Sequence, residues 1–279
     1  VRVVPCSGFD SIPSDLGCMH MVNSARSRGV EPEEVRMIVG DSKGGASGGT
    51  IASAINIITS TPLAELQKFA NPFALCARDP TTGEPDGPQD INPSMDCMTP
   101  GYDSVFKTYT APWIMQGVNT RVVNYSNSLL GWEWGRNFRY TERQGTGLVT
   151  ACITALALPV FSLLLFVPIT RWLLQKLVLP KQGEGPSEEL RETGFFRMKF
   201  WAKGRNTTTG EMETLKGGID AFEGDPGYKQ TAKMASEAAL CLLDSGLPAR
   251  YGVLTPASAM GEALQARLEE RGIHFYIDE

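Results

Sequence analysis

The chain opens with a strand, a turn and a helix start. Residues 2–17 read Arg-Val-Val-Pro-Cys-Ser-Gly-Phe-Asp-Ser-Ile-Pro-Ser-Asp-Leu-Gly, which predicts the end of a buried strand, a glycine turn and a helix capped by Ser14 or Asp15. No strand precedes this one that could pair with it, so we expect the numbering to begin inside a domain. We therefore expect a fragment of a longer protein whose first strand is an exposed edge.

Composition excludes several classes of protein. With 42% hydrophobic and 20% charged residues, the 279-residue chain is globular. Its net charge of -5 argues against a nucleic-acid partner, because phosphate binding needs clustered Lys and Arg side chains. The six cysteines form no CxxC pair and the two histidines lie far apart, so we expect no metal site.

Hydrophobic periodicity and turn residues place the other elements. A helix is predicted over 14–28, and a second strand, glycine loop and helix over 35–60. The proline- and aspartate-rich residues 78–104 predict a long surface loop. The remaining predicted elements are a helix from 62 to 70, a helix over 119–130, a strand over 135–140, a hairpin of 196–203 and 213 onward, a helix ending at 243, and a helix and closing strand within 253–277.

Four segments in collinear order carry a family likeness. They are Gly-Phe-Asp-Ser-Ile-Pro-Ser-Asp-Leu-Gly at 8–17, Gly-Gly-Ala-Ser-Gly-Gly-Thr at 44–50, Asn-Thr-Arg-Val-Val at 119–123 and Gly-Asp-Pro-Gly-Tyr at 224–228. Together they resemble the saccharopine dehydrogenase-like oxidoreductases, a group that includes trans-acting enoyl reductases of lipid synthesis. The likeness runs along nearly the whole chain.

The resemblance implies an α/β fold: the end of a Rossmann-type sheet plus an inserted α/β (α+β) substrate domain with its own sheet. Residues 1–30 would be the last strand and helix of the dinucleotide-binding domain, 31–223 the substrate or dimerisation domain, and 224–279 the helices and strand that return to the first domain. No G-x-G-x-x-G occurs in the chain, so the N-terminal Rossmann half is expected to be missing. The implied cofactor, NADP or NAD, would be held mainly by that half.

The loop between the first strand and helix is predicted to face the cofactor, because ligands of doubly wound sheets bind beyond the carboxyl ends of the strands. Its glycine would let the backbone pass close to a bound ring, and its polar side chains would orient the cofactor. The predicted cofactor-binding residues are Gly8, Phe9, Asp10, Ser11 and Asp15. The alternative is a structural helix cap in which Asp10 makes an Asx turn.

The glycine loop 44–50 also lies between a strand and a helix, where its N–H groups could hold a carboxylate or phosphate. No lysine follows its last glycine, so it is not a P-loop. We expect it to touch substrate; the alternative is a tight turn that needs positive φ. The predicted substrate-binding residues are Gly45, Ser47, Gly48, Gly49, Thr50 and Arg121.

The sequence alone assigns no catalytic residue. The candidates are Asp10, Ser11 and Tyr140, and none is assigned as the general acid. Arg121 lies among aromatic residues and could bind an acidic group of the substrate, or it could be paired structurally. Cys6 is expected to be a small buried hydrophobe, because no histidine lies near it in sequence to activate the thiol.

Residues 145–170 carry no charge, and this length is enough to span a bilayer core. A single crossing would put halves of one sheet domain on opposite sides of the membrane. We therefore expect a re-entrant or monotopic hairpin within 145–180, with helices 148–158 and 160–179, broken by Pro159 and Pro168. Trp172 and the flanking basic residues suit a headgroup boundary. The alternative is a buried core or dimer helix pair.

The sequence thus predicts an NAD(P)-dependent oxidoreductase, active when full length and inactive as this fragment. Its expected partners are a small hydrophobic, lipid-type substrate and a membrane or lipid-droplet surface bound through 145–180; a homodimer is left open. The expected location is the cytosolic face of a lipid droplet, mitochondrion or plasma membrane, without secretion. The alternative is a non-catalytic membrane- or lipid-droplet-associated protein that keeps the fold.

Overall fold

The computed structural model describes residues 1–45, 47–78, 85–88, 90, 94–181 and 183–278. They form the expected mixed α/β fold, with a seven-stranded sheet in the order β3-β4-β5-β2-β6-β7-β9 and a two-stranded sheet of β1 and β8. The strands are β1 (Arg2–Val3), β2 (Val30–Lys43), β3 (Gly101–Asp103), β4 (Thr108–Ala111), β5 (Arg139–Thr146), β6 (Phe195–Asn206), β7 (Met212–Ala221), β8 (Gly252–Val253) and β9 (His274–Ile277).

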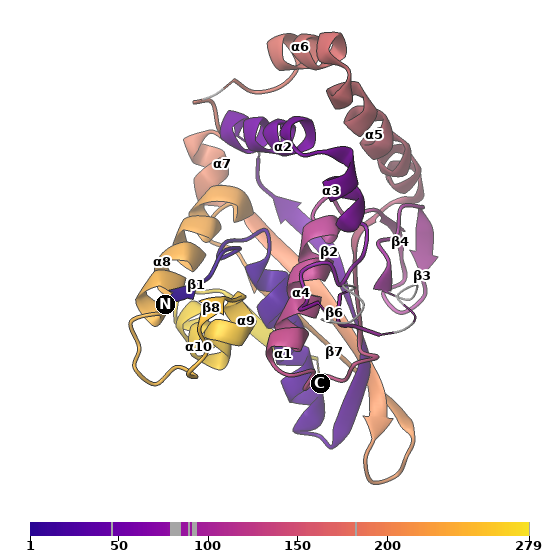
Figure 1. The fold of residues 1–279 in the computed structure, drawn as a ribbon, viewed down its shortest axis with the longest axis vertical. Coiled ribbons are helices and arrows are strands. Elements are labelled where there is room, and N and C mark those ends of the chain that lie inside the picture. The colour runs from indigo at the N-terminus through magenta and orange to yellow at the C-terminus, as the bar shows by residue number, and fades with distance from the viewer. Residues whose placement is uncertain (46, 79–84, 89, 91–93, 182, 279) are drawn as a thin grey trace.

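The helices gather in three places (Figure 1): α1 and α4 lie against one face of the large sheet, α8 to α10 lie beside them near β1 and β8, and α2, α5 and α6 occupy the top of the view. The helical segments are α1 (Ile12–Arg26), α2 (Gly48–Ser60), α3 (Leu63–Lys68), α4 (Gln116–Leu129), α5 (Leu148–Phe166), α6 (Pro168–Leu177), α7 (Glu188–Thr193), the π-helical turn η2 (Pro226–Gln230), α8 (Thr231–Cys241), α9 (Pro256–Ala259) and α10 (Gly261–Glu270).

The core lies between α1 and the large sheet. Successive side chains of a strand point to opposite faces, so Val35, Met37 and Val39 of β2 all face α1, and each is at most 1% exposed. The helix approaches β6 closely at Gly17, where a Cβ atom would overlap the Phe200 ring. This contact fixes the height of α1, and hence of the loop before it, above the sheet.

The predicted hairpin is confirmed as β6 and β7, paired antiparallel from Phe196↔Ala221 to Arg205↔Met212. β2 joins the two halves of the sheet, because it pairs parallel with β5 and antiparallel with β6. The chain on either side of the apolar segment, β5 before it and β6 after it, therefore flanks the same strand.

The N-terminal strand differs from the prediction. It is short and exposed, with Val3 at 52% exposure, and it pairs parallel with β8 in the register Arg2↔Gly252. The expectation that this strand has no partner in the chain was wrong, because its partner comes from the far end of the sequence, whereas the expected exposure of the strand is confirmed. The closing strand β9 pairs with β7 in the large sheet, and the expected division of the chain into domains stays a prediction.

The apolar segment forms two helices set at an angle, α5 and α6, rather than a hairpin bent at Pro159 (Figure 1). Pro159 lies inside α5, and the break falls at Val167, whose extended ψ of 120° lets Pro168 start α6. Proline needs no N–H donor at the first turn of a helix, so Pro168 suits this position. Gly147 alone separates β5 from α5.

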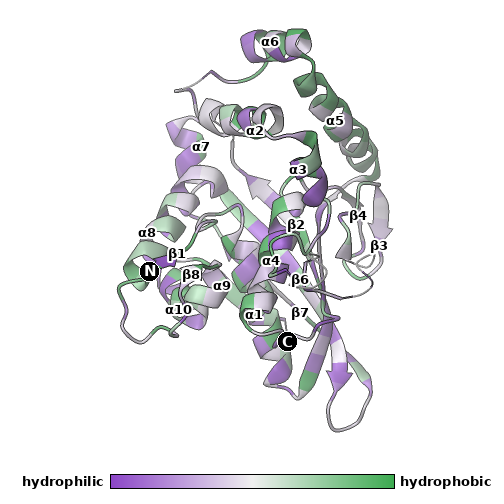
Figure 2. Ribbon diagram, in the orientation of Figure 1, coloured by the Kyte–Doolittle hydropathy of each residue, from purple (hydrophilic) through white to green (hydrophobic). Residues whose placement is uncertain are grey.

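Most residues of α5 are exposed, and Figure 2 shows the helix mainly in green, the colour of hydrophobic residues. Ala151 and Leu165 are the buried residues of this helix. Among the described residues, α5 is the one helix whose length and composition would allow it to cross a membrane. The alternative of a buried core helix is wrong within this chain.

Candidate functional site

The loop before α1 meets the start of α8. The Phe9 N–H donates to Thr231 Oγ1 at 3.1 Å, and a Cβ atom on Gly8 would lie 2.9 Å from Thr231 Cγ2. Because Thr231 lies this close, a side chain at position 8 would crowd it. This contact inside the chain explains the glycine at position 8. The same loop closes on itself, because the N–H groups of Ser11 and Ile12 donate to the Gly8 carbonyl at 3.2 and 2.9 Å.

The glycine loop before α2 meets the turn before α8. A Cβ atom on Gly44 would lie 2.7 Å from Pro226 Cδ, and Thr50 Oγ1 lies 3.2 Å from the Tyr228 hydroxyl. The turn is held by Asp225, whose carboxylate accepts from the N–H groups of Tyr228 and Lys229 at 3.1 and 2.9 Å. Two segments whose contacting residues Thr50 and Tyr228 lie 178 positions apart in sequence thus share one corner of the molecule.

The predicted substrate loop has its own structural ties. Ser47 caps α2, accepting from the Thr50 N–H at 3.2 Å, and the Gly48 N–H donates to the Glu184 carbonyl at 2.9 Å. A Cβ atom on Gly45 would meet Pro186 at 3.2 Å, and one on Gly49 would meet only Ser47 Oγ at 3.5 Å. A role of Gly45, Gly48 and Gly49 in substrate binding stays a prediction.

A buried polar cluster joins α1, α4 and β5 behind the first loop. Ser11 Oγ donates to Asn119 Oδ1 at 2.9 Å, and Asn119 Nδ2 donates to Glu142 Oε1 at 2.9 Å. Glu142 Oε2 accepts from the hydroxyls of Ser14 and Tyr140 at 2.8 and 2.9 Å. All five side chains are at most 2% exposed. Burial dominates over the hydrogen bonds and raises the pKa of Glu142 to about 7.

A second buried carboxylate, that of Asp15, lies on α1 one helical turn after Ser11. Asp15 is fully buried, and its oxygens accept from the Ser126 hydroxyl and, at 2.8 Å, from the Ala257 N–H. Ser126 also lies 2.6 Å from Thr255 Oγ1. Loss of solvent raises the pKa of Asp15 to about 7 despite these donors. Asp15 therefore holds the start of α9, and both its oxygens are occupied within the chain.

The first loop presents Asp10 to solvent, and partial burial by the surrounding loops raises the pKa of its carboxyl group. The helix begins at Ile12 after Ser11, whose side chain makes no capping bond, so the predicted cap by Ser14 or Asp15 is wrong. Both side chains point into the interior instead. Of the predicted polar residues in this loop, Asp10 is the one open to a ligand.

Two sequence-based expectations for single residues need correction. Cys6 is exposed rather than buried, and it takes a left-handed φ of 60°, which is uncommon outside glycine. Desolvation raises the pKa of its thiol. Tyr140 is fully buried, and its hydroxyl faces Glu142, so it does not reach a ligand in this structure.

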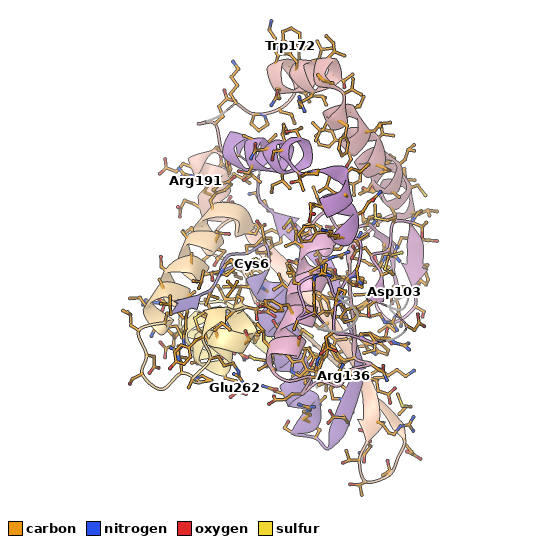
Figure 3. The ribbon with its side chains drawn as sticks, in the orientation of Figure 1. Cys6, Asp103, Arg136, Trp172, Arg191 and Glu262 are labelled. Atoms are coloured by element: carbon orange, nitrogen blue, oxygen red, sulfur yellow. The ribbon has the colours of Figure 1, made fainter. Side chains whose placement is uncertain are left out.

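Arg121 is held structurally. It pairs with Asp96, and its other nitrogens donate to the carbonyls of Phe69 and Ala70 at 2.7 to 2.9 Å. Its side chain is 4% exposed, which favours the structural alternative over contact with an acidic substrate. Arg136 lies near the opposite end of the molecule from Trp172 (Figure 3) and pairs with Asp86.

Glu142 and Asn119 were not predicted from the sequence to be partners in one cluster. A signal existed for Asn119, because it opens the segment 119–123 that carries the family likeness. No sequence signal pointed to Glu142, because polar residues lie on both faces of β5 and the alternation does not show which face is buried. A cleft of about 570 Å³ on the opposite face of the sheet, lined by Asp41, Arg197 and Lys199 among others, was also not foreseen.

The four segments that carry the likeness therefore come together in space. Ser11 bonds to Asn119, Phe9 bonds to Thr231 just beyond the turn at 224–228, and Thr50 contacts Tyr228. In Figure 3, Cys6 lies close to this corner, between the first loop and α8. The described residues hold no group of three His, Cys, Asp or Glu side chains that could bind a metal ion.

The chain is similar to curated mycobacterial proteins. A Mycobacterium tuberculosis protein that carries the provisional name of a trans-acting enoyl reductase is 39% identical over 295 aligned positions. Trans-acting enoyl reductases of Mycobacterium ulcerans and Mycobacterium leprae are 34% and 30% identical. Each alignment covers 98% of this chain and 66% of the relative. No protein-family model and no solved structure matches. The shared names support an oxidoreductase role.

Proposed function

We infer from this similarity that the chain belongs to the enoyl reductase family of these relatives, and we propose that it supplies the substrate side of an NAD(P)H-dependent reductase of lipid-type substrates at a membrane surface. The chain spans about two thirds of the length of the relatives it matches, so the activity proposed is that of the whole protein. The observation that carries the proposal is the chain of contacts that links the four likeness segments: Asn119 bonds to the Asp10 loop, that loop bonds to the start of α8, and the turn before α8 contacts the glycine loop.

Reduction of an enoyl group adds a hydride to one carbon of the double bond and a proton to the other. NADPH or NADH would supply the hydride when bound. The N–H groups of Phe9, Ser11 and Ile12 are already bonded within the chain, so they are not free to hold a pyrophosphate. The polar contribution of this loop would come from the Asp10 carboxylate, which can accept a hydrogen bond from the carboxamide of the cofactor or from substrate.

The buried cluster serves this loop as a support. Ser11 is fixed by Asn119, and Asn119 is in turn fixed by Ser14 and Glu142. A residue whose rotamer is locked by buried hydrogen bonds holds its neighbours in place, so the cluster would keep Asp10 in one position relative to the sheet. Glu142 and Tyr140 act in this proposal as positioning residues.

Membrane attachment would come from α5 and α6. A helix that is apolar all round and exposed has no stable place in water, and α5 is about 28 Å long at 1.5 Å per residue, close to the thickness of a bilayer core. Lys176 Nζ lies 4.8 Å from the Trp172 ring centre, and Figure 3 shows Trp172 at the outer end of the molecule. Because β5 and β6 pair with the same strand, both flanks of the segment would stay on one side of the bilayer.

The activity test uses the natural full-length protein with NADPH and a long-chain α,β-unsaturated acyl substrate, and follows NADPH absorbance. Asp10→Asn should lower kcat/KM at least tenfold, whereas Asp278→Asn, a change at an exposed position on the opposite side of the sheet, should leave it unchanged. Absence of NADPH binding at millimolar concentration would contradict the proposal and favour a non-catalytic protein with the same fold.

The attachment test is flotation with phospholipid vesicles that contain anionic lipid. The intact chain should float with the vesicles, and a chain in which residues 148–178 are replaced by a short Gly/Ser linker should stay in the soluble fraction. Circular dichroism should show that the remaining sheet is retained. An intact chain that is freely soluble as a monomer, or a deleted chain that still floats, would overturn this part of the proposal.

A further inference from the structure

We propose that His20 of α1 is a pH-sensitive switch, which holds α10 against α1 while its ring is neutral and releases this contact when the ring is protonated. The two helices face each other across a polar cavity of about 390 Å³. Its lining includes His20 and Asn23 of α1 and Glu262, Gln265 and Glu269 of α10. None of these residues belongs to the candidate site, so the inference does not depend on the reductase activity proposed above.

Gln265 determines the protonation state of His20 through two bonds. Its side-chain nitrogen lies 3.0 Å from His20 Nδ1 and donates to Glu269 Oε1 at 3.0 Å. A carboxylate can only accept, so the contact with Glu269 assigns the nitrogen of the Gln265 amide, and not its oxygen, to this position. The amide then donates its second hydrogen to His20 Nδ1, which must offer a lone pair. His20 is therefore the neutral tautomer that carries its proton on Nε2.

The other ring nitrogen lies where a charge is unfavourable. His20 Nε2 is buried and has no hydrogen-bond partner among the described residues. The ring packs edge-to-face against Phe275 of β9, with the ring centres 5.7 Å apart. Loss of solvent lowers the pKa of His20 and outweighs the opposing effect of the nearby Glu269 carboxylate. The contact with α10 is therefore complete above the ordinary pKa of histidine and is lost as the pH falls.

A second proton on the ring removes this contact. Protonated Nδ1 would face the hydrogens of the Gln265 amide, and turning that amide would place its oxygen against the Glu269 carboxylate, so one of the two bonds is lost in either case. The charged ring can leave Phe275 and turn into the cavity, whose charged lining residues in the described chain are Glu262 and Glu269. The neighbours from α1 and β9 that line the cavity or touch the ring are uncharged. Burial thus favours the neutral ring inside, and the two carboxylates favour the charged ring in the cavity.

The test measures amide hydrogen exchange of the 279-residue protein at pH 7.5 and pH 5.5, corrected for the intrinsic effect of pH on exchange. Protection of the α10 amides should fall about fivefold at pH 5.5, as expected for the loss of one hydrogen bond. Glu142 and Asp15 do not cause such a fall, because their raised pKa values make folding more favourable as the pH falls.

Two matched variants identify the titrating group. His20→Asn keeps a hydrogen-bond acceptor and does not titrate, so it should abolish the fall in protection. His274→Asn changes the other histidine of the chain, which is exposed on β9, and should leave the fall unchanged. A fall of equal size in the wild type and in His20→Asn would overturn the proposal.

Nitrogen-15 NMR of the histidine rings tests the tautomer directly. The chain has two histidines, so His274→Asn assigns the His20 signals by elimination. At pH 7.5 these signals should show a proton on Nε2 and none on Nδ1, and the ring should titrate below the ordinary pKa of histidine. A proton on Nδ1 at pH 7.5, or titration at or above the ordinary value, would contradict the assignment. Neither measurement uses NADPH, vesicles or substrate, so failure of this inference is distinguishable from failure of the proposed function.

Discussion

Asn119 donates from its side-chain amide to Glu142 Oε1 at 2.9 Å, and this bond joins α4 to β5 in the interior of the molecule. The same side chain accepts from Ser11 at the base of the Asp10 loop. One buried carboxylate thus supports the helix, the strand and the predicted ligand loop together. Its protonation state must matter for the stability of all three.

The free energy of unfolding should fall as the pH rises from about 4.5 to about 7. Glu142 has a pKa of about 7 in the folded state against 4.5 when unfolded, so the folded state holds a proton that the unfolded state has lost in this range. The stabilisation is complete below pH 4.5 and lost above the folded pKa. The expected slope is about 1 kcal/mol per pH unit for this group. Urea denaturation at several pH values measures it.

Glu142→Gln is the matched variant for this experiment, because glutamine keeps the shape and has no titration. Its pH slope should be shallower than that of the wild type, and the residual slope should belong to Asp15, whose pKa is also about 7. Identical slopes for the wild type and Glu142→Gln would show that Glu142 is not the titrating group.

Arg121→Ala should destabilise the protein by roughly 3 kcal/mol, because it leaves Asp96 without its partner and removes the donors to the Phe69 and Ala70 carbonyls. Arg136→Ala, which breaks the exposed pair with Asp86, should cost less than about 1 kcal/mol. Chemical denaturation compares the two. If Arg121→Ala unfolds at the wild-type urea midpoint and changes only the KM for substrate, Arg121 is a binding residue after all.

Gly44→Ala should cost roughly 1 to 3 kcal/mol, since its new methyl group would lie 2.7 Å from Pro226 and push the glycine loop away from the turn before α8. Gly49→Ala is the control, because its methyl group would meet Ser47 Oγ at an ordinary 3.5 Å. Thermal unfolding of both variants measures the difference in stability between them. A loop that serves only to bind ligand would tolerate both changes equally.

Leu163→Glu should reduce flotation with vesicles at least tenfold, because it places a charge on the exposed surface of α5, where Leu163 is 65% exposed. Leu243→Glu introduces the same change at a leucine that is 81% exposed after α8, and flotation should persist. Equal flotation of Leu163→Glu and Leu243→Glu would remove α5 from the proposed membrane surface.

Local signals predicted much of the secondary structure. The alternating residues 196–203 and the Asn206-to-Gly210 turn gave the β6 and β7 hairpin, and the glycine after residue 28 ended α1 within a few positions. Both features depend on neighbours in sequence. The pairing of β1 with β8 does not, since its partners lie 250 residues apart.

The errors concern one proline inside an exposed helix and two residues that tertiary contacts bury. Pro159 was expected to break the helix, but α5 continues through it to Phe166. Arg121 finds Asp96 in a segment without periodicity, so spacing gave no hint of the pair. Tyr140 was assigned to the site by its position after an aromatic and basic run, whereas the register of β5 against β2 turns it into the core.

Gly147 is the single link between β5 and α5, and its carbonyl is already held by the Ala151 N–H at 2.8 Å. The helix can therefore reorient relative to the sheet only through the two backbone torsions of one residue. The helix is therefore coupled rigidly to β5, and no flexible linker lies between them. A force that tilted the helix would act directly on the strand that carries Glu142, five positions before the hinge.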